Sequence, residues 1–352
     1  MLILTDLPIS LWAALAFSSL VAGVVIKSRL NYLSLPEIET HSPTSEPPDC
    51  MVVIPARNEE ALVGRAVKSL PPDSVLVVDD DSTDNTVEAA RAAGAGILPA
   101  PKLGKGANGK SNACAEGARV LTSKWILFAD ADTHYQPGFL ESVVATAESR
   151  KVDFVSVYLR PEFATLGEML SGPVAGVLYF FGINPRANPA GAFLGQCVLV
   201  RREAYEFVGG HGTVIKDLCE DVKLVALAQR HRMKFAVVRA DYLGRVRIRT
   251  EGLARRMHRF TQVSPFIGLR IMLGAAVLAC WAPVTAWLLA DHQPVPAAAL
   301  ALWPVLLLSG RYEGIFRALL APFGVYTMLL RGTAAALGVL TGRAVEWKGR
   351  VI

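Results

Sequence analysis

A long uncharged apolar run near the start of the chain sets the first limit on the fold. Residues 9–26 read ISLWAALAFSSLVAGVVI and carry no charged side chain. A helix needs about 17–25 mainly apolar residues to cross a bilayer, and this run is of that length. Lys27 and Arg29 follow the run, whereas a cleaved signal peptide carries its positive charge before it. The pattern predicts an uncleaved anchor over residues 1–30 whose C-terminal side faces the cytoplasm.

Residues 266–352 hold the remaining apolar runs. The runs at 269–290 and 295–309 are separated by polar residues and predict a membrane hairpin. A third run, 315–341, contains Pro322 and an Arg-Gly pair, so spanning, re-entrant and interfacial placements all stay open. The basic tail after it favours two full C-terminal spans, which keep the tail in the cytoplasm. We therefore expect a multi-pass protein of the inner (plasma) membrane with a cytoplasmic middle region.

The composition agrees with this expectation. Hydrophobic residues make up 52% of the chain, and the mean hydropathy is +0.36. The net charge of +5 suits an anionic membrane surface, and no basic run interleaved with aromatic residues predicts nucleic-acid binding. The cysteines show no metal-ligand spacing, so we expect buried, unpaired thiols. They are Cys50, Cys114, Cys197, Cys219 and Cys280.

Residues 31–49 form a proline-containing linker, and the sequence pattern of residues 50–265 is typical of one α/β domain. Strands are expected at 50–56, 74–81, 96–100 and 124–132, and helices at 59–70, 83–94, 110–121 and 220–231. Strands that alternate with helices predict a mostly parallel, doubly wound, Rossmann-like sheet. Ligands of such sheets bind at the carboxyl ends of the strands.

Acidic residues gather at three of these strand ends, in the sequences PARNEE, DDDSTD and DAD. Helix capping, for example by Asp81 or Ser82, explains a single cluster but not all three together. In an extended segment, residues i and i+2 point the same way. Where the backbone turns at a strand end, the carboxylates of Asp130 and Asp132 can share one divalent cation. Hard oxygen ligands of this kind suit Mg²⁺ or Mn²⁺ holding a diphosphate.

The segment GKGANGKS at 104–111 matches the phosphate loop of nucleotide triphosphatases. A phosphate loop directly follows a strong strand, whereas the strand expected before this segment is weak, contains Pro99 and is followed at once by Pro101. A membrane-tethered phosphate-loop ATPase is therefore the rival interpretation. In the favoured one, Lys110 opens a helix and reaches toward a nucleotide diphosphate from the edge of the sheet.

The motifs VVIPARNEE, VLVVDDDSTDNT, GKSNACAEGA, ILFADADT and CEDVKL together resemble the inverting glycosyltransferases of family 2, which have the GT-A fold. The resemblance covers roughly residues 50–265. It implies a nucleotide-sugar donor, expected to be a UDP-sugar, and a Mg²⁺ or Mn²⁺ cofactor. It assigns Asp132 as the metal ligand, and Asp81 stands where the family usually has Gly. The nucleotide-binding residues that it implies are Ala56, Arg57, Glu59, Asp80, Lys110 and Asp130.

An inverting transferase needs a base that takes the proton of the acceptor hydroxyl. Asp221 resembles the catalytic base of the family, with Glu220 beside it on the side of the leaving group and acceptor. The alternative is that both acids favour the positive end of a helix, and the two roles are compatible. His211 is either an acceptor contact or a structural residue.

Arg256, Arg259 and Phe260 resemble a family motif in which two arginines clamp the leaving diphosphate and a Trp walls the acceptor site. The alternative is a basic segment placed before a membrane span. Phe260 in place of Trp, and the few spans, disfavour a polysaccharide synthase of the same fold.

The acceptor expected from the resemblance is a membrane lipid. EGLARRMHRF, GKSNACAEGA and VEWKGR are similar to membrane members of the family that glycosylate isoprenoid or carotenoid, hopanoid and sphingoid lipids. The apolar segment 163–183 is either a core helix of the catalytic domain or an interfacial helix that dips toward the bilayer. The expected partners are a nucleotide-sugar, a lipid acceptor and the bilayer, with no nucleic acid.

Overall fold

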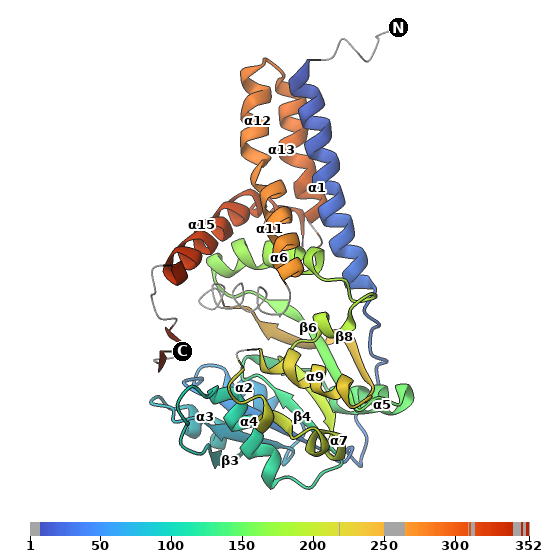
Figure 1. The fold of residues 1–352 in the computed structure, drawn as a ribbon, viewed down its shortest axis with the longest axis vertical. Helices are drawn as coiled ribbons and strands as arrows, with labels where there is room; N and C mark the ends of the chain where they lie inside the picture. Colours follow the sequence, from blue (N-terminus) through green and yellow to red (C-terminus); the bar gives the residue numbers. More distant parts are fainter. Residues whose placement is uncertain are drawn as a thin grey trace. The chain divides into compact units, whose positions relative to one another are not determined.

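The computed structural model describes residues 8–217, 219–249, 265–308, 310, 314–340, 346–347 and 350–351 (Figure 1). The chain divides into two compact units. We call Met1–Ser34, Phe163–Arg186 and Ile248–Ala344 the helical unit, and Leu35–Glu162, Ala187–Arg247 and Val345–Ile352 the sheet unit.

The helical unit contains the apolar runs. Its helices are α1 (Ile9–Leu33), α6 (Leu166–Gly182), α11 (Pro265–Ala279), α12 (Trp281–Ala290), α13 (Pro294–Leu308), α14 (Ile315–Ala318) and α15 (Ala321–Leu340). Helix α1 packs beside α12 and α13, while α6 contacts α1, α11 and α15 (Figure 1). By length and composition, two described segments are apolar enough to cross a membrane, Ile9–Leu33 and Phe266–Ala290.

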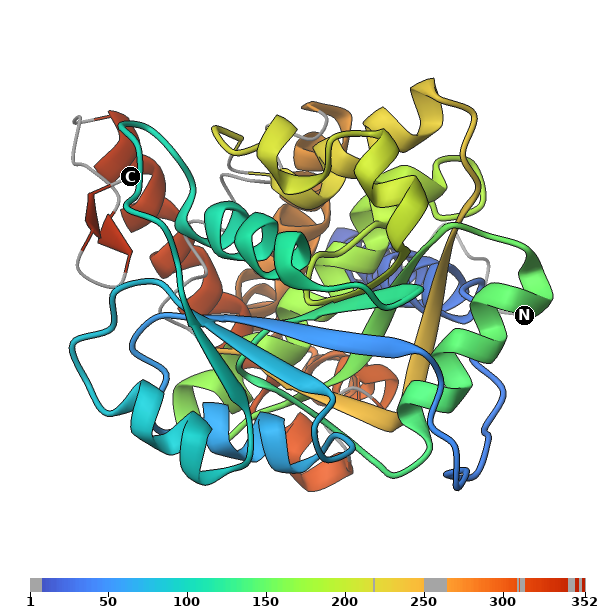
Figure 2. The same ribbon diagram turned by 90° about the horizontal axis from the view of Figure 1, so that it is seen from below.

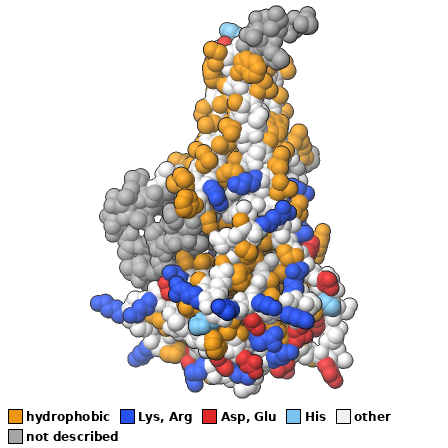
Figure 3. Space-filling view, turned by 45° about the vertical axis from the view of Figure 1, so that its right-hand side comes forward, with side chains coloured by type: hydrophobic (Ala, Val, Ile, Leu, Met, Phe, Trp, Pro, Cys, Tyr) orange, Lys and Arg blue, Asp and Glu red, His pale blue; other side chains and the backbone are white. Residues whose placement is uncertain are grey.

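Much of the described surface of the helical unit is apolar. Large hydrophobic side chains of α1 and α11, among them Leu20, Leu30, Leu269 and Met272, are exposed. Figure 3 shows hydrophobic side chains over much of the visible surface of these helices. An exposed apolar surface of this kind needs a lipid or protein cover.

Segment 163–183, expected to be either a core helix of the catalytic domain or an interfacial helix, contains helix α6. It begins at a capping box, in which Thr165 Oγ1 accepts from the Glu168 backbone N–H and the Glu168 carboxylate accepts from that of Thr165. Its buried side chains include Val174, Val177 and Phe180. Because the helix packs against α1, α11 and α15, it belongs to the helical unit and not to the core of the sheet unit.

The sheet unit is built on one eight-stranded sheet of order β3-β2-β1-β4-β7-β6-β8-β5. The strands are β1 (Cys50–Ala56), β2 (Val75–Asp79), β3 (Gly96–Pro99), β4 (Trp125–Ala129), β5 (Thr133–Tyr135), β6 (Phe154–Glu162), β7 (Cys197–Arg201) and β8 (Phe235–Arg247). Strands β3, β2, β1 and β4 are parallel, as expected. Strand β7 is antiparallel to β4 and β6, β8 is parallel to β6, and β5 is antiparallel to β8. The sheet is therefore mixed, and its parallel half carries the predicted acidic edge.

Helices cover both faces of this sheet, with α2 and α3 on one face and α4 on the other (Figure 2). The helices are α2 (Val63–Lys68), α3 (Thr86–Ala92), α4 (Gly109–Val120), α5 (Phe139–Arg150), α7 (Arg202–Phe207), α8 (Gly210–Thr213) and α9 (Glu220–Arg230), with a 3₁₀ turn at Pro189–Ala192 and a short ribbon of β9 (Glu346–Trp347) and β10 (Arg350–Val351).

Helix α4 packs tightly because Gly117 has no side chain. A Cβ atom there would lie 2.6 Å from Val53 Cγ1 of β1.

Candidate functional site

The loops after β1 and β2 form one hydrogen-bonded unit. Arg57 is buried, and its Nη1 atom donates to the backbone oxygens of Asp80 and Asp81. The Asp80 N–H donates in turn to Ala56 O at 2.8 Å. The Glu59 N–H donates a hydrogen bond to Thr86 Oγ1 at the start of α3. Four of the predicted nucleotide-binding residues, Ala56, Arg57, Glu59 and Asp80, are thus brought together at one edge of the sheet.

This bonding also explains why α2 and α3 begin later than expected. The residues before each helix are engaged across the two loops: Glu60 Oε2 accepts from the Asn85 N–H at 3.0 Å, and Asp84 Oδ2 accepts from the Glu60 N–H at 3.2 Å. Side chains that satisfy loop N–H groups hold the backbone outside the helix.

Asp81 occupies the position where glycine was expected. Its φ of +59° lies in the left-handed region, which glycine adopts without strain. Aspartate tolerates this conformation better than most residues with a side chain. The departure from the family pattern therefore leaves the turn in the conformation that a glycine would take.

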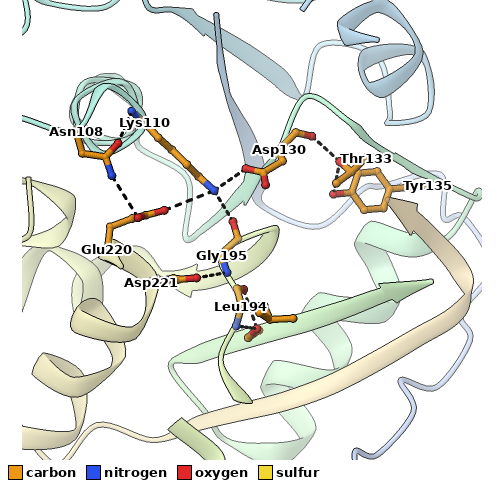
Figure 4. A network of polar contacts seen from close by, with 10 residues as sticks. Asn108, Lys110, Asp130, Thr133, Tyr135, Leu194, Gly195, Glu220 and Asp221 are labelled. Carbon is orange, nitrogen blue, oxygen red and sulfur yellow. Dashed lines mark hydrogen bonds and ion pairs between the residues drawn. The ribbon is translucent and has the colours of Figure 1, made fainter. Parts of the chain in front are cut away.

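Lys110 lies at the centre of a polar network (Figure 4). Its Nζ atom is 2.6 Å from Asp130 Oδ1 and 3.8 Å from Glu220 Oε1, and it donates to Gly195 O at 2.8 Å. Burial opposes the charge on Lys110, but Asp130 and Glu220 outweigh it and hold the pKa of the lysine above its usual value. Lys110 thus stays an ammonium that offsets the charge of these two carboxylates.

Asn108 connects the start of α4 with the start of α9. Its Oδ1 atom accepts from the Lys110 N–H at 3.0 Å and caps α4. Its Nδ2 atom donates to Asp217 O at 3.2 Å and to Glu220 Oε2 at 3.3 Å. The cap therefore places Lys110 opposite the buried Glu220 carboxylate.

Asp221 is held by two backbone amides. Its Oδ2 atom accepts from the Gly195 N–H at 2.8 Å, and its Oδ1 atom accepts from the Val222 N–H at 2.9 Å. The backbone of Gly195 thus contacts Lys110 through its carbonyl and Asp221 through its amide (Figure 4). This arrangement fixes the carboxylate at the first turn of α9.

Gly195 was not among the residues predicted from sequence. A Cβ atom there would lie 3.0 Å from Asp221 Oδ2, so any side chain larger than that of glycine would press on the carboxylate. The buried Ser156 hydroxyl donates to Leu194 O and accepts from the Leu194 N–H, both at 2.9 Å, and so anchors the segment to β6. The one local signal was a glycine just before the apolar run CVLV.

Asp130 and Asp132 follow β4 and are both partly exposed. The Asp130 N–H donates to Gln196 O at 2.9 Å, and Asp132 O accepts from the Arg247 N–H at 3.0 Å. Among the described residues, no three His, Cys, Asp or Glu side chains are grouped to hold a metal ion. Mg²⁺ commonly binds through one or two carboxylates, with phosphate oxygens and waters completing the shell. The Asp130–Asp132 pair fits an ion held in that way.

The structural context of GKGANGKS is not that of a phosphate loop. Strand β3 is an exposed edge strand that ends at Pro99, and α4 begins only at Gly109. The Lys110 N–H is already bonded to the side chain of Asn108. The segment is instead a loop and a helix cap that place Lys110 in the network.

His211 lies in a buried aromatic cluster. Its ring packs edge-on against Phe128 with centroids 4.6 Å apart, and its Nδ1 atom is 2.8 Å from Tyr205 Oη. Burial, followed by the nearby Lys110 charge, lowers the pKa of His211 to about 3. These contacts describe a neutral structural histidine, which was one of the two roles considered for it. The other predicted acceptor residues, Arg256, Arg259 and Phe260, lie outside the described residues.

Known proteins resemble both the sequence and the fold. The sequence profile of glycosyl transferase family 2 matches residues 51–209. Residues 51–209 form a family 2 glycosyltransferase domain. The 4,4'-diaponeurosporenoate glycosyltransferase of Staphylococcus haemolyticus is 28% identical over 225 residues, which is 60% of this chain and 59% of that protein. The Staphylococcus aureus protein of the same name is 27% identical over 187 residues, 49% of each chain. The alignments thus span about half of these curated relatives.

A solved structure shows a fold similar to that of this chain. The mannosyltransferase PcManGT of Pyrobaculum calidifontis, in complex with GDP-Man and Mn²⁺, aligns with a TM-score of 0.52 and 18% identity. The alignment covers 91% of this chain and 97% of that one. The GT-A fold expected from the sequence is confirmed.

Proposed function

We propose that the chain is a membrane-bound inverting glycosyltransferase that moves a sugar from a nucleotide-sugar, most simply a UDP-sugar, to a lipid acceptor. The observation that carries the proposal is the network in which the backbone of Gly195 joins Lys110 to Asp221 at the carboxyl edge of a family 2 domain. It supplies a fixed base and a fixed cation beside a carboxylate pair suited to a metal and a diphosphate.

The base in this proposal is Asp221. It takes the proton of the acceptor hydroxyl while the acceptor oxygen bonds to the anomeric carbon. The bond from that carbon to the diphosphate breaks at the same time, and its electron pair leaves with the nucleoside diphosphate. Attack from the face opposite the leaving group inverts the configuration. The amides of Gly195 and Val222 hold the carboxylate in position for this transfer.

We assign the other charged residues of the site to binding the nucleotide-sugar donor. Asp132, with Asp130 beside it, would hold Mg²⁺ or Mn²⁺, and the bound ion would supply a positive charge for the departing diphosphate. Lys110 and Glu220 fix the orientation of Asp130 and of the Gly195 carbonyl. Arg57 holds together the two loops that we assign to binding the uracil and ribose of the nucleotide.

The lipid acceptor is proposed on two grounds. The staphylococcal relatives are named for 4,4'-diaponeurosporenoate as the acceptor, and this chain carries two apolar segments long enough to cross a membrane. A membrane-embedded acceptor accounts for the joining of such segments to a family 2 domain. The location follows as the inner membrane, with the sheet unit in the cytoplasm.

Titration calorimetry of the full chain in a non-ionic detergent tests this function. We expect UDP to bind only with Mn²⁺ or Mg²⁺, and more tightly than GDP or ATP. Asp132→Ala should remove the metal-dependent binding, whereas Glu88→Ala, an exposed carboxylate of α3, should leave it unchanged. Asp221→Asn should keep UDP binding and slow transfer to a hydroxyl acceptor by about 10²- to 10⁴-fold, because the base is lost.

Two results would contradict the proposal. ATP binding without UDP binding would mean that the chain is a phosphate-loop ATPase after all. Unchanged transfer by Asp221→Asn would remove Asp221 from the mechanism. For a carboxylate acceptor a smaller loss is expected, since that nucleophile is already ionised near neutral pH.

A further inference from the structure

Two cationic side chains from different helices of the helical unit meet at the C-terminal end of α6. The ammonium of Lys27, on α1, lies 4.7 Å from the centroid of the Phe181 ring. The Arg270 Nη1 atom, on α11, donates to Gly182 O at 3.4 Å. Both cations are exposed, and they are held on consecutive residues of the same helix.

Close helix packing places Arg270 at this position. A Cβ atom on Gly182 would lie 2.6 Å from Ile271 Cγ1, and one on Gly274 would lie 2.8 Å from Phe181 Cδ1. Small residues at a crossing let two helices approach closely. Since α11 meets the end of α6 at Ile271, the preceding Arg270 is held there as well.

The end of α6 does not require the charge of Lys27. Asn31 Nδ2 donates to Phe180 O and to Ile183 O, both at 2.8 Å, and Arg270 bonds the carbonyl between them. Within residues 8–217 and 265–308, the side-chain contacts of Lys27 and Arg270 are the aromatic ring and the carbonyl, with no carboxylate beside either. Two like charges held close together on a nearly apolar surface attract an anion.

The surroundings indicate what kind of anion fits. Ile26 and Leu30 flank Lys27 on α1 and are exposed. Phe266, one helical turn before Arg270 on α11, is also exposed. A free inorganic anion would use the cations alone, whereas a lipid would also cover these side chains with its acyl chains. We propose that Lys27 and Arg270 bind the phosphate of an anionic phospholipid whose acyl chains lie against this apolar surface.

Native mass spectrometry of the full chain in a non-ionic detergent tests this site. Phosphatidylglycerol and phosphatidylcholine with the same acyl chains are added over a range of concentrations. We expect one phosphatidylglycerol to bind at concentrations where phosphatidylcholine does not. Lys27→Ala should weaken this binding about tenfold through loss of a charge-assisted contact. Lys27→Arg should restore it.

Arg29→Ala is the matched control, since it removes an equal charge from the same helix. Arg29 is exposed, and it has no contact with α6 like those of Lys27. Equal weakening by Lys27→Ala and Arg29→Ala would show diffuse attraction and overturn the site. Equal binding of the two lipids would overturn it too. Displacement of phosphatidylglycerol by equimolar inorganic phosphate would show a free-anion site instead of a lipid site.

The inference rests on the proposed membrane location and not on sugar transfer. The mass-spectrometry experiment measures lipid binding to the helical unit with no sugar donor or acceptor present. The UDP titration measures nucleotide binding to the sheet unit. The two proposals can therefore fail separately.

Discussion

At the scale of residues, Gly195 decides how the proposed base is held. This one residue supplies both the carbonyl bound by Lys110 and the amide bound to Asp221. Its backbone is not in the left-handed region, so alanine is compatible with its φ angle. The constraint is instead the 3.0 Å between an added Cβ atom and Asp221 Oδ2.

Gly195→Ala should therefore displace the carboxylate while leaving the fold intact. We expect kcat for transfer to fall by up to about tenfold, because the carboxylate must shift by a few tenths of an ångström and a shift of about 1 Å costs about 100-fold. The Kd for UDP should change by less than about threefold. Gly212→Ala, where an added Cβ meets nothing within 4 Å, is the control and should behave as wild type. An equal loss of kcat and UDP affinity would point to general damage.

His211 makes stability depend on pH. Its folded pKa of about 3 lies below the usual value of 6.5, so the unfolded chain binds the proton more readily between these values. The contribution of His211 to stability is complete above about pH 6.5 and is lost as the pH falls toward about 3. Lowering the pH from 6.5 to 5.5 should cost about 1 kcal/mol from this group.

The measurement is the thermal unfolding midpoint of the full chain in detergent across this pH range. Wild type should lose stability steadily below pH 6.5, and His211→Gln should show a flatter dependence, whatever its absolute midpoint. Parallel curves for the two proteins would assign the acid sensitivity to other groups.

At the scale of elements, the fit of α4 against the sheet depends on Gly117. A Cβ atom there would lie 2.6 Å from Val53 Cγ1 and 3.0 Å from Val78 Cγ2. Both valines are fully buried in β1 and β2, so neither has room to move. Because α4 also carries Lys110, its packing sets the position of the site.

Gly117→Ala should thus destabilise the protein by about 1–3 kcal/mol, the usual cost of overpacking a core. Gly64→Ala in α2 is the contrasting variant, since its added Cβ lies no closer than 3.6 Å to any atom. It should be neutral or stabilising by up to about 1 kcal/mol, because alanine favours helix. Thermal unfolding of both variants separates these outcomes, and equal destabilisation would contradict the packing argument.

At the scale of the whole molecule, the reactivity of each cysteine thiol depends on whether that residue is buried in the folded chain. All five cysteines are free; Cys50, Cys114, Cys197 and Cys219 are buried and Cys280 is exposed. Burial raises the pKa of Cys197 to about 12 and raises those of Cys50 and Cys114 as well. The expectation of unpaired thiols is confirmed, and that of burial holds for four of them.

Cys280 lies within the apolar segment Phe266–Ala290, which detergent covers, so a membrane-permeant maleimide is needed to reach it. Labelling of the native chain with this reagent at neutral pH should modify one thiol, and Cys280→Ser should abolish that label. Denaturation without reductant should expose all five thiols, which mass spectrometry can count. Fewer than five would reveal a disulfide, and rapid native labelling of Cys197 would contradict its burial.

Several features were predictable because their signals are local. The strand at 50–56 was predicted with its exact bounds, since an apolar run between a proline-rich linker and polar turn residues is a sufficient strand signal. The helix at 110–121 was within one residue at each end. The gathering of acids at one sheet edge followed from the parallel order of β1, β2 and β4. The apolar run at 9–26 lies within α1, and the run at 269–290 is divided between α11 and α12.

Only the tertiary structure decided how distant segments combine. The contacts of Gly195 with Lys110 and Asp221 join residues 85 and 26 positions apart, and no periodicity or cap encodes them. The order of β5 to β8 and the place of α6 in the helical unit likewise depend on which surfaces meet. A local pattern states that a surface must be buried, but the partner that buries it is chosen by the packing of the folded chain.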